Sequence, residues 1–309
     1  MKSQKTNPPI LVLGGTGHYG RNIVRSLLEK GQPVRVLSRN ATNAHRVLGD
    51  GVEIVEGDIT SREAVTKALK EVQAVVISVS AFSPKLVRQL RLIERDAVLM
   101  VLDEAQKAGV SRVVYVSVYD IKQDLLKRLN LDLETARIKQ EVETALARSG
   151  FNWTVLGAPP SMETFFAMIR GDTMMVPGGG PPALPTVSPV DVGEIAAQTV
   201  LKDDLRGKRI RMVGPEAISF PEAAKRISAA TGRNIRFCRI PLIPLNIASI
   251  VTWPINPFLR LLYGHVKLMN NFPQDIAAQV PQDHQWLVDT FDYAPVTLEM
   301  EARRRAHQN

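Results

Sequence analysis

A cluster of glycines between two apolar runs is the feature that most restricts how this chain can fold. Four glycines fall within LVLGGTGHYGRNIV (residues 11–24): Gly14, Gly15, Gly17 and Gly20. Glycine weakens both strands and helices, so this cluster indicates a turn where side chains would obstruct the backbone. The run 9–14 has the pattern of a buried strand, and residues 19–30 have the pattern of a helix that ends at Gly31.

The glycine spacing matches the physical needs of a loop that holds a pyrophosphate. After the strand, the chain must turn sharply, pass close to the phosphates and open a helix whose first amides face the anion. Gly14 suits the turn, Gly15 to Gly17 the close approach, and Gly20 the contact between helix and strand. We therefore predict that the whole loop binds a dinucleotide: Gly14, Gly15, Thr16, Gly17, His18, Tyr19 and Gly20. The alternative is a glycine-rich turn without a ligand.

The end of the next predicted strand (34–37) indicates which dinucleotide is bound. An NAD site usually carries Asp or Glu there, about 20 residues after the first glycine, to bind the ribose 2′-hydroxyl. Here the strand ends in VLSRN, so Ser38 and Arg39 take that place. A guanidinium can bind a 2′-phosphate through two parallel hydrogen bonds. The sequence thus predicts NADP (NADPH) rather than NAD, and the alternative is that Arg39 is a solvated loop residue.

Apolar runs and amphipathic stretches continue to alternate along the first half of the chain. We predict strands at 52–55, 74–79, 113–118 and 153–156, and helices at 61–70, 84–108 and 133–148. Strands that are apolar on both faces, with helices between them, are typical of a parallel, doubly wound sheet, which is a Rossmann-like α/β fold. Ligands of such sheets lie beyond the carboxyl ends of the strands, so further cofactor contacts are expected from Asp58, Ile59, Ser78, Val79 and Ser80. The alternative for Asp58 is a turn residue or a helix N-cap.

The chain becomes richer in loops after residue 157. We assign residues 1–158 to the dinucleotide-binding domain, with 186–213 expected to return to it. Residues 159–185 and 214–309 are expected to form a smaller C-terminal substrate-binding or lid region.

The most apolar stretch of the chain is 240–263. It is long enough to cross a bilayer, but its four prolines, two asparagines and one arginine argue against a membrane-spanning helix. We expect this stretch, together with 162–169, to be buried or to wall a substrate pocket. The alternatives for 240–263 are contact with a membrane surface or with a second copy of the chain.

Charge and cysteine content restrict the partners. The net charge is +8, but only 303–305 form a basic run, so nucleic acid is not expected as a partner and an anionic cofactor accounts for part of the charge. Cys238 is the single cysteine and the five histidines show no ligand spacing, so we expect neither a disulfide nor a metal site. The polar start, residues 1–9, lacks the apolar core of a signal peptide, which favours a cytoplasmic location.

The motifs together resemble a known family. The succession LVLGGTGHYGRNIVRSLLEKG, VEGDIT, AGVSRVVYVS and EVETALARSGFNWTVL, within residues 10–165, is similar to the NmrA-like branch of the atypical short-chain dehydrogenases/reductases. This branch includes isoflavone-reductase-like enzymes, quinone reductases and redox-sensing regulators. The resemblance implies an NAD(P) site, a serine after the fifth strand, here Ser117, and a lysine, here Lys139, that orients the nicotinamide ribose or supplies a proton.

Two positions depart from the family pattern. Active dehydrogenases place a tyrosine four residues before the lysine, whose ammonium lowers the pKa of the phenol. The phenol then exchanges a proton with the substrate while the cofactor exchanges hydride. This chain has Thr135 at that position, and Gly157 where the family has an arginine after the sixth strand. The usual acid–base mechanism is therefore not expected unchanged.

Other residues remain as candidates for proton transfer. Lys139 can act alone, or the phenol of Tyr119 can replace the missing tyrosine, with Ser117 beside the substrate. Each residue also has a structural interpretation. Lys139 is then a solvated lysine paired weakly with Glu143, Ser117 is a polar strand end and Tyr119 is a packed aromatic ring.

The function predicted from these observations is that of an NADPH-dependent reductase. It would transfer hydride to a small hydrophobic carbonyl, enone or quinone. One alternative is an NADP(H)-binding regulator or assembly protein that acts on a protein partner without turnover. Another is a membrane-associated or electron-transfer accessory subunit in which the dinucleotide is structural. The chain is expected to be a monomer or a homodimer.

Overall fold

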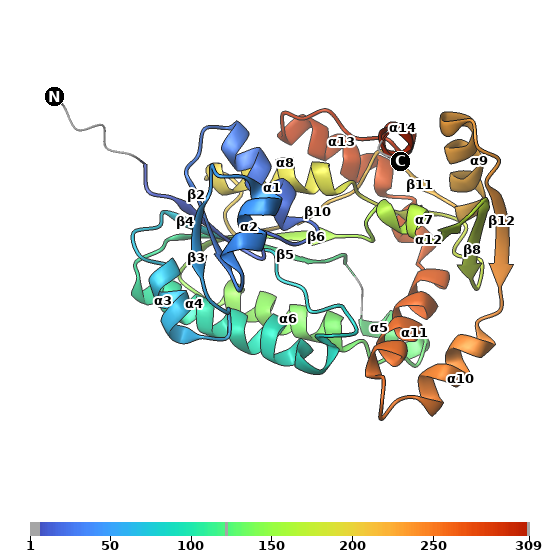
Figure 1. The fold of residues 1–309 in the computed structure, drawn as a ribbon, viewed down its shortest axis with the longest axis horizontal. Helices are drawn as coiled ribbons and strands as arrows, with labels where there is room; N and C mark the ends of the chain where they lie inside the picture. Colours follow the sequence, from blue (N-terminus) through green and yellow to red (C-terminus); the bar gives the residue numbers. More distant parts are fainter. Residues whose placement is uncertain (1–6, 121–122, 308–309) are drawn as a thin grey trace.

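A computed structural model describes residues 7–120 and 123–307, so residues 1–6 of the polar start lie outside the described part. Seven strands form the central sheet: β1 (Ile10–Leu13), β2 (Val34–Ser38), β3 (Glu53–Glu56), β4 (Ala74–Ile77), β5 (Arg112–Val118), β6 (Asn152–Ala158) and β10 (Lys208–Arg211). Their order is β10-β6-β5-β4-β1-β2-β3, and every neighbouring pair is parallel (Figure 1). The order reverses between β1 and β4, which is where open sheets of this kind bind their ligands.

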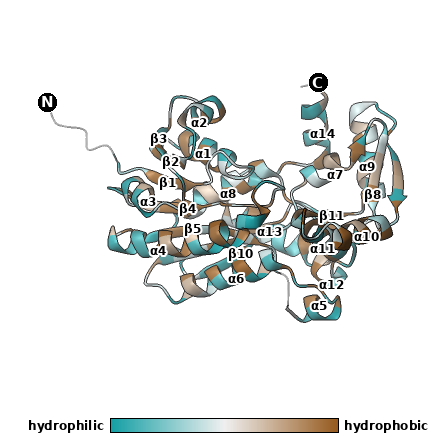
Figure 2. Cartoon of the chain, turned by 60° about the horizontal axis from the view of Figure 1, so that its bottom comes forward, coloured by the Kyte–Doolittle hydropathy of each residue, from teal (hydrophilic) through white to brown (hydrophobic). Residues whose placement is uncertain are grey.

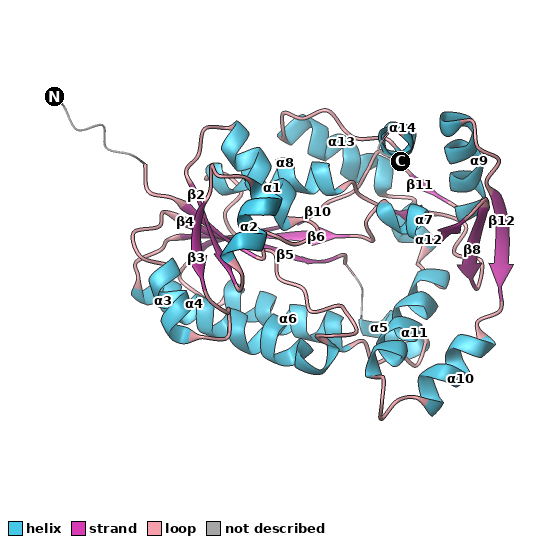
Figure 3. Cartoon of the chain, viewed as in Figure 1, coloured by secondary structure: helices cyan, strands magenta, loops and turns pink. Residues whose placement is uncertain are grey.

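Helices cover both faces of this sheet (Figure 3). The helices of the two layers are α1 (Gly20–Glu29) and α8 (Pro189–Leu201) on one face, and α3 (Arg62–Ala68), α4 (Ala97–Lys107) and α6 (Glu134–Ala147) on the other. Side chains of β1 alternate between the layers, with Ile10 and Val12 in one hydrophobic cluster and Leu11 and Leu13 in the other. The predicted doubly wound α/β sheet is thus confirmed.

One predicted helix, 84–108, begins later than expected and is irregular. Residues 84–86 form a turn, followed by the 3-10 turn η1 (Val87–Gln89), the π-helical turn η2 (Leu92–Asp96) and then α4. A π turn inserts one extra residue into a helix and is often found at functional sites. Here it directs Glu94 inward, where only 2% of the residue is exposed.

Apart from α2, which lies next to α1 and β3, most of the remaining elements form a second region beside the carboxyl ends of the strands (Figure 1). A small sheet has the order β12-β8-β7, with β7 (Ile169–Arg170), β8 (Thr173–Pro177) and β12 (Arg236–Ile240), and β9 (Leu184–Pro185) pairs with β11 (Ala217–Ile218). The helices not yet named are α2 (Ala41–Leu48), α5 (Gln123–Arg128), α7 (Glu163–Ala167), α9 (Phe220–Thr231), α10 (Ile243–Val251), α11 (Pro257–Asn270), α12 (Gln274–Ala277), α13 (Val280–Thr290) and α14 (Leu298–Ala306).

The two stretches expected to be buried or to wall a pocket, 162–169 and 240–263, differ in how far their apolar side chains are buried. Met162 and Phe165 are fully packed, and the Phe165 ring lies 5.1 Å from that of Phe220 on α9. The apolar composition of α10 is visible in the hydropathy colours of Figure 2. The expectation of burial is wrong for this helix, because its large apolar side chains are mostly exposed, whereas most apolar residues in the second half of α11 are buried. Within the described residues, every helix falls short of the length and hydropathy needed to cross a membrane.

Candidate functional site

The glycine turn between β1 and α1 leaves no room for side chains. Gly14 has a φ of 79°, in the left-handed region that favours glycine, and a Cβ there would collide with the Ser78 carbonyl group at the end of β4. A Cβ at Gly20 would collide with the carbonyl group of Gly14, so α1 lies directly against the turn. A Cβ at Gly15 would lie 2.8 Å from a methyl group of Val36 on β2. The glycines are therefore required by close backbone packing.

The start of α1 presents unpaired amides at this turn. Its N-cap residue, Tyr19, provides no side-chain cap, and the first turn holds no acidic residue. The Gly17 amide bonds to the Gly14 carbonyl oxygen at 2.9 Å, while the amides of Gly15, Thr16 and His18 find no acceptor among the described residues. Free amides and the positive end of the helix dipole together favour an anion such as a pyrophosphate.

The side chains of His18 and Tyr19 reach away from the turn toward the second region. His18 lies 3.0 Å from the Ser161 hydroxyl and 3.2 Å from Glu163, and burial lowers the pKa of its imidazole despite the Glu163 carboxylate, which raises it. The phenol of Tyr19 donates to the Pro159 carbonyl oxygen at 3.5 Å. Both therefore connect the glycine turn to the segment that follows β6.

The end of β2 carries an unhindered guanidinium. Arg39 is 64% exposed and reaches only to 4.0 Å from the Asp58 carboxylate. Ser38 donates to the Asn40 carbonyl oxygen at 3.2 Å. Asp58 accepts from the amide and hydroxyl of Thr60, at 2.8 Å and 2.7 Å, so it shapes the turn after β3. The Arg39 guanidinium is therefore largely open to solvent.

A buried ion pair holds the loop after β4, which contains Ser78, Val79 and Ser80. The Lys139 ammonium of α6 donates to the Val79 carbonyl oxygen at 2.9 Å and lies 3.2 Å from Glu94 of the π turn. The other oxygen of Glu94 accepts from the Ala81 amide at 2.6 Å. Only 7% of Lys139 and 2% of Glu94 are exposed.

The surroundings of Lys139 keep it charged. Burial lowers its pKa, but the neighbouring Tyr115 phenol and Glu94 carboxylate raise it by more, so the net pKa lies above the usual range. Burial raises the pKa of Tyr115, on β5, to about 12. The interpretation of Lys139 as a solvated lysine paired with Glu143 is wrong, because Glu94 is its partner.

Glu143 instead bonds Ser117 and Arg209. Ser117, at the end of β5, donates its hydroxyl to Glu143, and Arg209 of β10 lies 2.9 Å from the same carboxylate. Arg209 also donates to the Val118 carbonyl oxygen at 2.8 Å. A Cβ at Gly157 would lie 2.8 Å from the Arg209 guanidinium, so the glycine leaves space for an arginine side chain from β10, the neighbouring strand in the sheet.

Tyr119 packs inside the molecule. It is 2% exposed, and its ring lies 6.2 Å from that of Phe272. Burial raises the pKa of its phenol well above the usual range. Each of the three predicted catalytic residues, Lys139, Ser117 and Tyr119, thus has its own separate set of partners.

Thr135, at the position of the missing tyrosine, pairs with a histidine that the sequence did not indicate. Its hydroxyl lies 3.0 Å from Nε2 of His265 on α11. Nδ1 of His265 lies 2.8 Å from the Leu261 carbonyl oxygen, which can only accept, so we assign the proton to Nδ1 and the acceptor role to Nε2. The rings of His265 and Phe82, in the loop after β4, are 4.8 Å apart, and burial lowers the pKa of His265.

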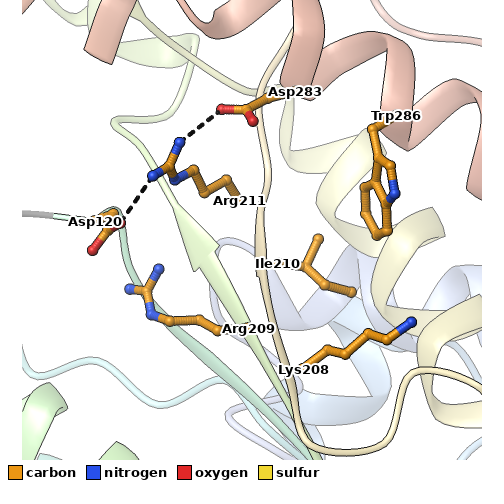
Figure 4. Close-up of a pocket in the computed structure, with 7 residues that line it drawn as sticks. All are labelled: Asp120, Lys208, Arg209, Ile210, Arg211, Asp283 and Trp286. Atoms are coloured by element: carbon orange, nitrogen blue, oxygen red, sulfur yellow. Dashed lines mark hydrogen bonds and ion pairs between the residues drawn. The ribbon is translucent and has the colours of Figure 1, made fainter. Parts of the chain in front are cut away.

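Two cavities border these groups. One, of about 500 Å³, opens beside the edge strand β10, where Arg211 spans Asp120 and Asp283 at 3.2 Å and 3.5 Å (Figure 4). The other, of about 850 Å³, lies between α1, α2, α8 and α14. Arg209 lines the first cavity and Glu163 the second, whereas the glycine turn, Arg39 and the Lys139–Glu94 pair lie at the carboxyl ends of β1, β2 and β4.

A family model matches residues 6–297, nearly the whole chain. The chain belongs to the NmrA-like family. Two relatives of this NmrA-like protein are the photosystem II assembly factor Ycf39 of Synechocystis sp. and the NAD(P)H azoreductase of Xenophilus azovorans. The first is 25% identical over 83% of this chain and 79% of the relative, and the second 27% identical over 75% and 77%.

Solved structures share the fold of this NmrA-like protein. The NADPH-dependent quinone oxidoreductase QOR2 of Escherichia coli superposes with a TM-score of 0.72 at 18% identity, over 96% of this chain and 99% of the other. The triphenylmethane reductase of Citrobacter sp., complexed with NADP(H), gives a TM-score of 0.73 at 18% identity over the same shares. At this identity the likeness establishes the fold alone.

Proposed function

We propose that this NmrA-like protein is an NADPH-dependent reductase that transfers hydride to a small hydrophobic carbonyl, enone or quinone. The observation that carries the proposal is the combination at one sheet edge of a side-chain-free phosphate turn, an unhindered Arg39 and a paired Thr135 and His265. Bound NADPH would supply the hydride. All other steps depend on residues of this chain.

The cofactor would be held by the residues that fit its two phosphate groups. The free amides of Gly15, Thr16 and His18 would bind the pyrophosphate, and Arg39 the 2′-phosphate, displacing its distant partner Asp58. This arrangement supports NADP over NAD, since the end of β2 lacks the carboxylate that a ribose 2′-hydroxyl would need. The structures of relatives complexed with NADPH or NADP(H) agree with this choice.

Lys139 would act as a positioning residue. Its ammonium is engaged with Val79 and Glu94, and its pKa is raised, so it is a poor proton donor near neutral pH. It would instead fix the loop of Ser78, Val79 and Ser80, along which the nicotinamide half of the cofactor would lie.

The proton would come through Thr135 and His265. When His265 is protonated, Nε2–H donates to the Thr135 oxygen, which frees the Thr135 hydroxyl proton for the reduced substrate. The imidazolium then loses its proton to Thr135, and solvent restores it. The lowered pKa of His265 means that this step would slow as pH rises.

The substrate would approach between the two regions of the chain. Phe82, 39% exposed, and Phe258, whose ring lies 5.3 Å from it, offer an apolar aromatic wall next to His265. We propose that residues 159–185 and 214–309 form this substrate side, as predicted from the sequence. Such a wall favours flat, apolar acceptors, and an azoreductase is among the relatives, with quinone and triphenylmethane reductases among the structural neighbours. We place this activity in the cytoplasm.

Purified protein should oxidise NADPH when supplied with quinones or enones. The assay follows absorbance at 340 nm with a panel of acceptors, and calorimetry on the same sample measures NADPH binding. Gly20→Val, which fills the phosphate turn, is the matched control and should lose both binding and oxidation. Bound NADPH that is oxidised by none of the acceptors would contradict the proposal.

A second function is favoured by the buried state of Lys139 and the absent tyrosine. The chain would bind NADP(H) without turnover and act on a protein partner, as an assembly factor or redox-sensing regulator. The Ycf39 relatives, named as assembly factors, support it. This function requires different affinities for NADP⁺ and NADPH, because only a difference in affinity shifts a conformational equilibrium. Equal affinities combined with turnover would exclude it.

A further inference from the structure

The helix α10 and the turn after it present an apolar surface to solvent. Six residues form it, hereafter the α10 surface: Ile243, Ile247, Ile250, Val251, Trp253 and Ile255. Their exposed fractions range from 46% for Trp253 to 84% for Ile255. In Figure 1, α10 lies at the margin of the molecule, far from the central sheet and next to α11.

The helix α10 carries apolar side chains on both sides: Leu245 packs against the hydrophobic core, while its isoleucines are exposed. Ile243, Ile247 and Ile250 follow at intervals of four and three residues, so they lie on one face of the helix. That face is turned outward, whereas the buried residue of α10 is polar Ser249, which bonds to the Asn246 carbonyl oxygen at 2.7 Å. A helix that directs its isoleucines outward is built to meet an apolar partner.

The surface is held in place by contacts with neighbouring elements. Arg88 of η1 donates to the carbonyl oxygens of Pro254 and Ile255, at 2.9 Å and 3.1 Å. The Arg260 guanidinium of α11 lies 4.5 Å from the centre of the Trp253 ring. Because these contacts fix the turn, the apolar side chains are presented in one arrangement before any partner binds.

The surroundings of the α10 surface are basic. No acidic residue occurs between Glu222 and Asp275, a span that contains seven lysines and arginines. Exposed Lys85, Arg88 and Arg260 lie in the elements that contact the surface or the turn. Apolar side chains bordered by arginine and lysine, with a tryptophan at the boundary, match the interface of an anionic bilayer.

We propose that the α10 surface inserts into the interfacial region of an anionic phospholipid membrane, with α10 lying in the membrane plane. A stable protein interface uses about 20–30 residues on each side, far more than this surface offers. Interfacial insertion, in contrast, needs a few apolar side chains that enter about 5–10 Å. The inference stands whether or not the chain turns over NADPH.

Vesicle sedimentation of the full chain tests the proposal. Vesicles of phosphatidylcholine alone are compared with vesicles that contain one third phosphatidylglycerol, at low and high salt. We expect binding to the anionic vesicles that weakens with salt, and at least tenfold weaker binding of the Ile247→Glu/Ile250→Glu variant. The matched control Val190→Glu/Leu201→Glu, which adds the same charges to exposed apolar positions of α8, should bind as the wild type does.

Fluorescence locates the inserted residue. Anionic vesicles should shift the tryptophan emission to shorter wavelength, and Trp253→Phe should abolish the shift although two other tryptophans remain. Equal binding of wild type and the Ile247→Glu/Ile250→Glu variant, or no binding to either vesicle, would overturn the proposal. So would a wild-type dimer in gel filtration that the same variant separates into monomers, since the surface would then join two copies of the chain.

Discussion

Replacing Glu94 by leucine tests how the loop after β4 is held. In Glu94→Leu, the Lys139 ammonium stays buried without its counter-charge, and the Ala81 amide loses its acceptor. Removing one partner of a buried ion pair destabilises a protein by roughly 3–5 kcal/mol. The pair is almost fully buried, so solvent screens it little, and we expect a loss of about 3 kcal/mol or more.

Urea denaturation at neutral pH measures the effect, with fluorescence and circular dichroism as probes. Glu29→Leu is the matched control, because Glu29 pairs with Arg25 at 2.8 Å while both side chains are more than half exposed. It should lose less than about 1 kcal/mol. The double variant Glu94→Leu/Lys139→Met should recover most of the stability, because apolar groups of similar volume replace both charges.

Two results would refute this reasoning. One is a Glu94→Leu variant as stable as the Glu29→Leu control. The other is a double variant no more stable than Glu94→Leu alone, since the loss would then come from packing rather than from an uncompensated charge. Weaker NADPH binding by Glu94→Leu, measured by calorimetry, would in addition support the link between the pair and the cofactor loop.

Three further predictions concern cofactor choice and pH. Arg39→Ala should weaken NADPH binding at least tenfold and leave NADH binding unchanged, because hydrogen bonds to charged groups contribute roughly 1.5–3 kcal/mol. Calorimetry with both cofactors measures the two affinities. An equal loss of affinity for NADPH and NADH would argue against a contact between Arg39 and the 2′-phosphate. Asp191 is 1% exposed, and burial raises the pKa of its carboxyl group in the folded chain to about 7. Between about pH 4 and pH 7 the folded chain therefore keeps a proton on Asp191 that the unfolded chain has released. Stability should therefore fall as pH rises from 4 to 7, and Asp191→Asn should flatten this slope in urea midpoints; an unchanged slope would show that Asp191 titrates normally. His265→Gln should remove the fall in kcat with rising pH that a lowered His265 pKa produces, whereas an unaltered pH profile would exclude His265 as the proton source.

Local patterns predicted the parts of the fold that depend on neighbours in sequence. The glycine turn is one, because Gly20 packs directly against the Gly14 carbonyl group only six residues earlier. The doubly wound sheet is another, since strands apolar on both faces require helices on both sides. The position of Arg39 directly after β2 was also predicted, from its distance in sequence to the first glycine of the turn.

Contacts between distant segments were beyond the reach of such patterns. The partner of Thr135 is His265, on a helix that joins α6 only in the folded chain. Arg209 occupies the space left by Gly157 because β10 pairs with β6, which no local signal specifies. The burial of Glu94 depends on a π turn that shifts the helical period by one residue.

The exposure of α10 shows a different limit of prediction from sequence. Apolar composition predicts that a segment leaves water, but it does not say whether the partner is the core of the same chain or another surface. Packing decided this, since the packed side of α10 carries Leu245 and the buried Ser249, whereas its isoleucines are exposed.

A single-turnover experiment tests the central proposal most directly. Protein in excess over NADPH is mixed anaerobically with menadione, a small hydrophobic quinone, and absorbance at 340 nm is followed. We predict a decay that saturates with menadione, is absent in Gly20→Val and slows with rising pH. NADPH that stays reduced on the protein, with binding verified by calorimetry, would contradict a reductase and leave the non-catalytic function in its place.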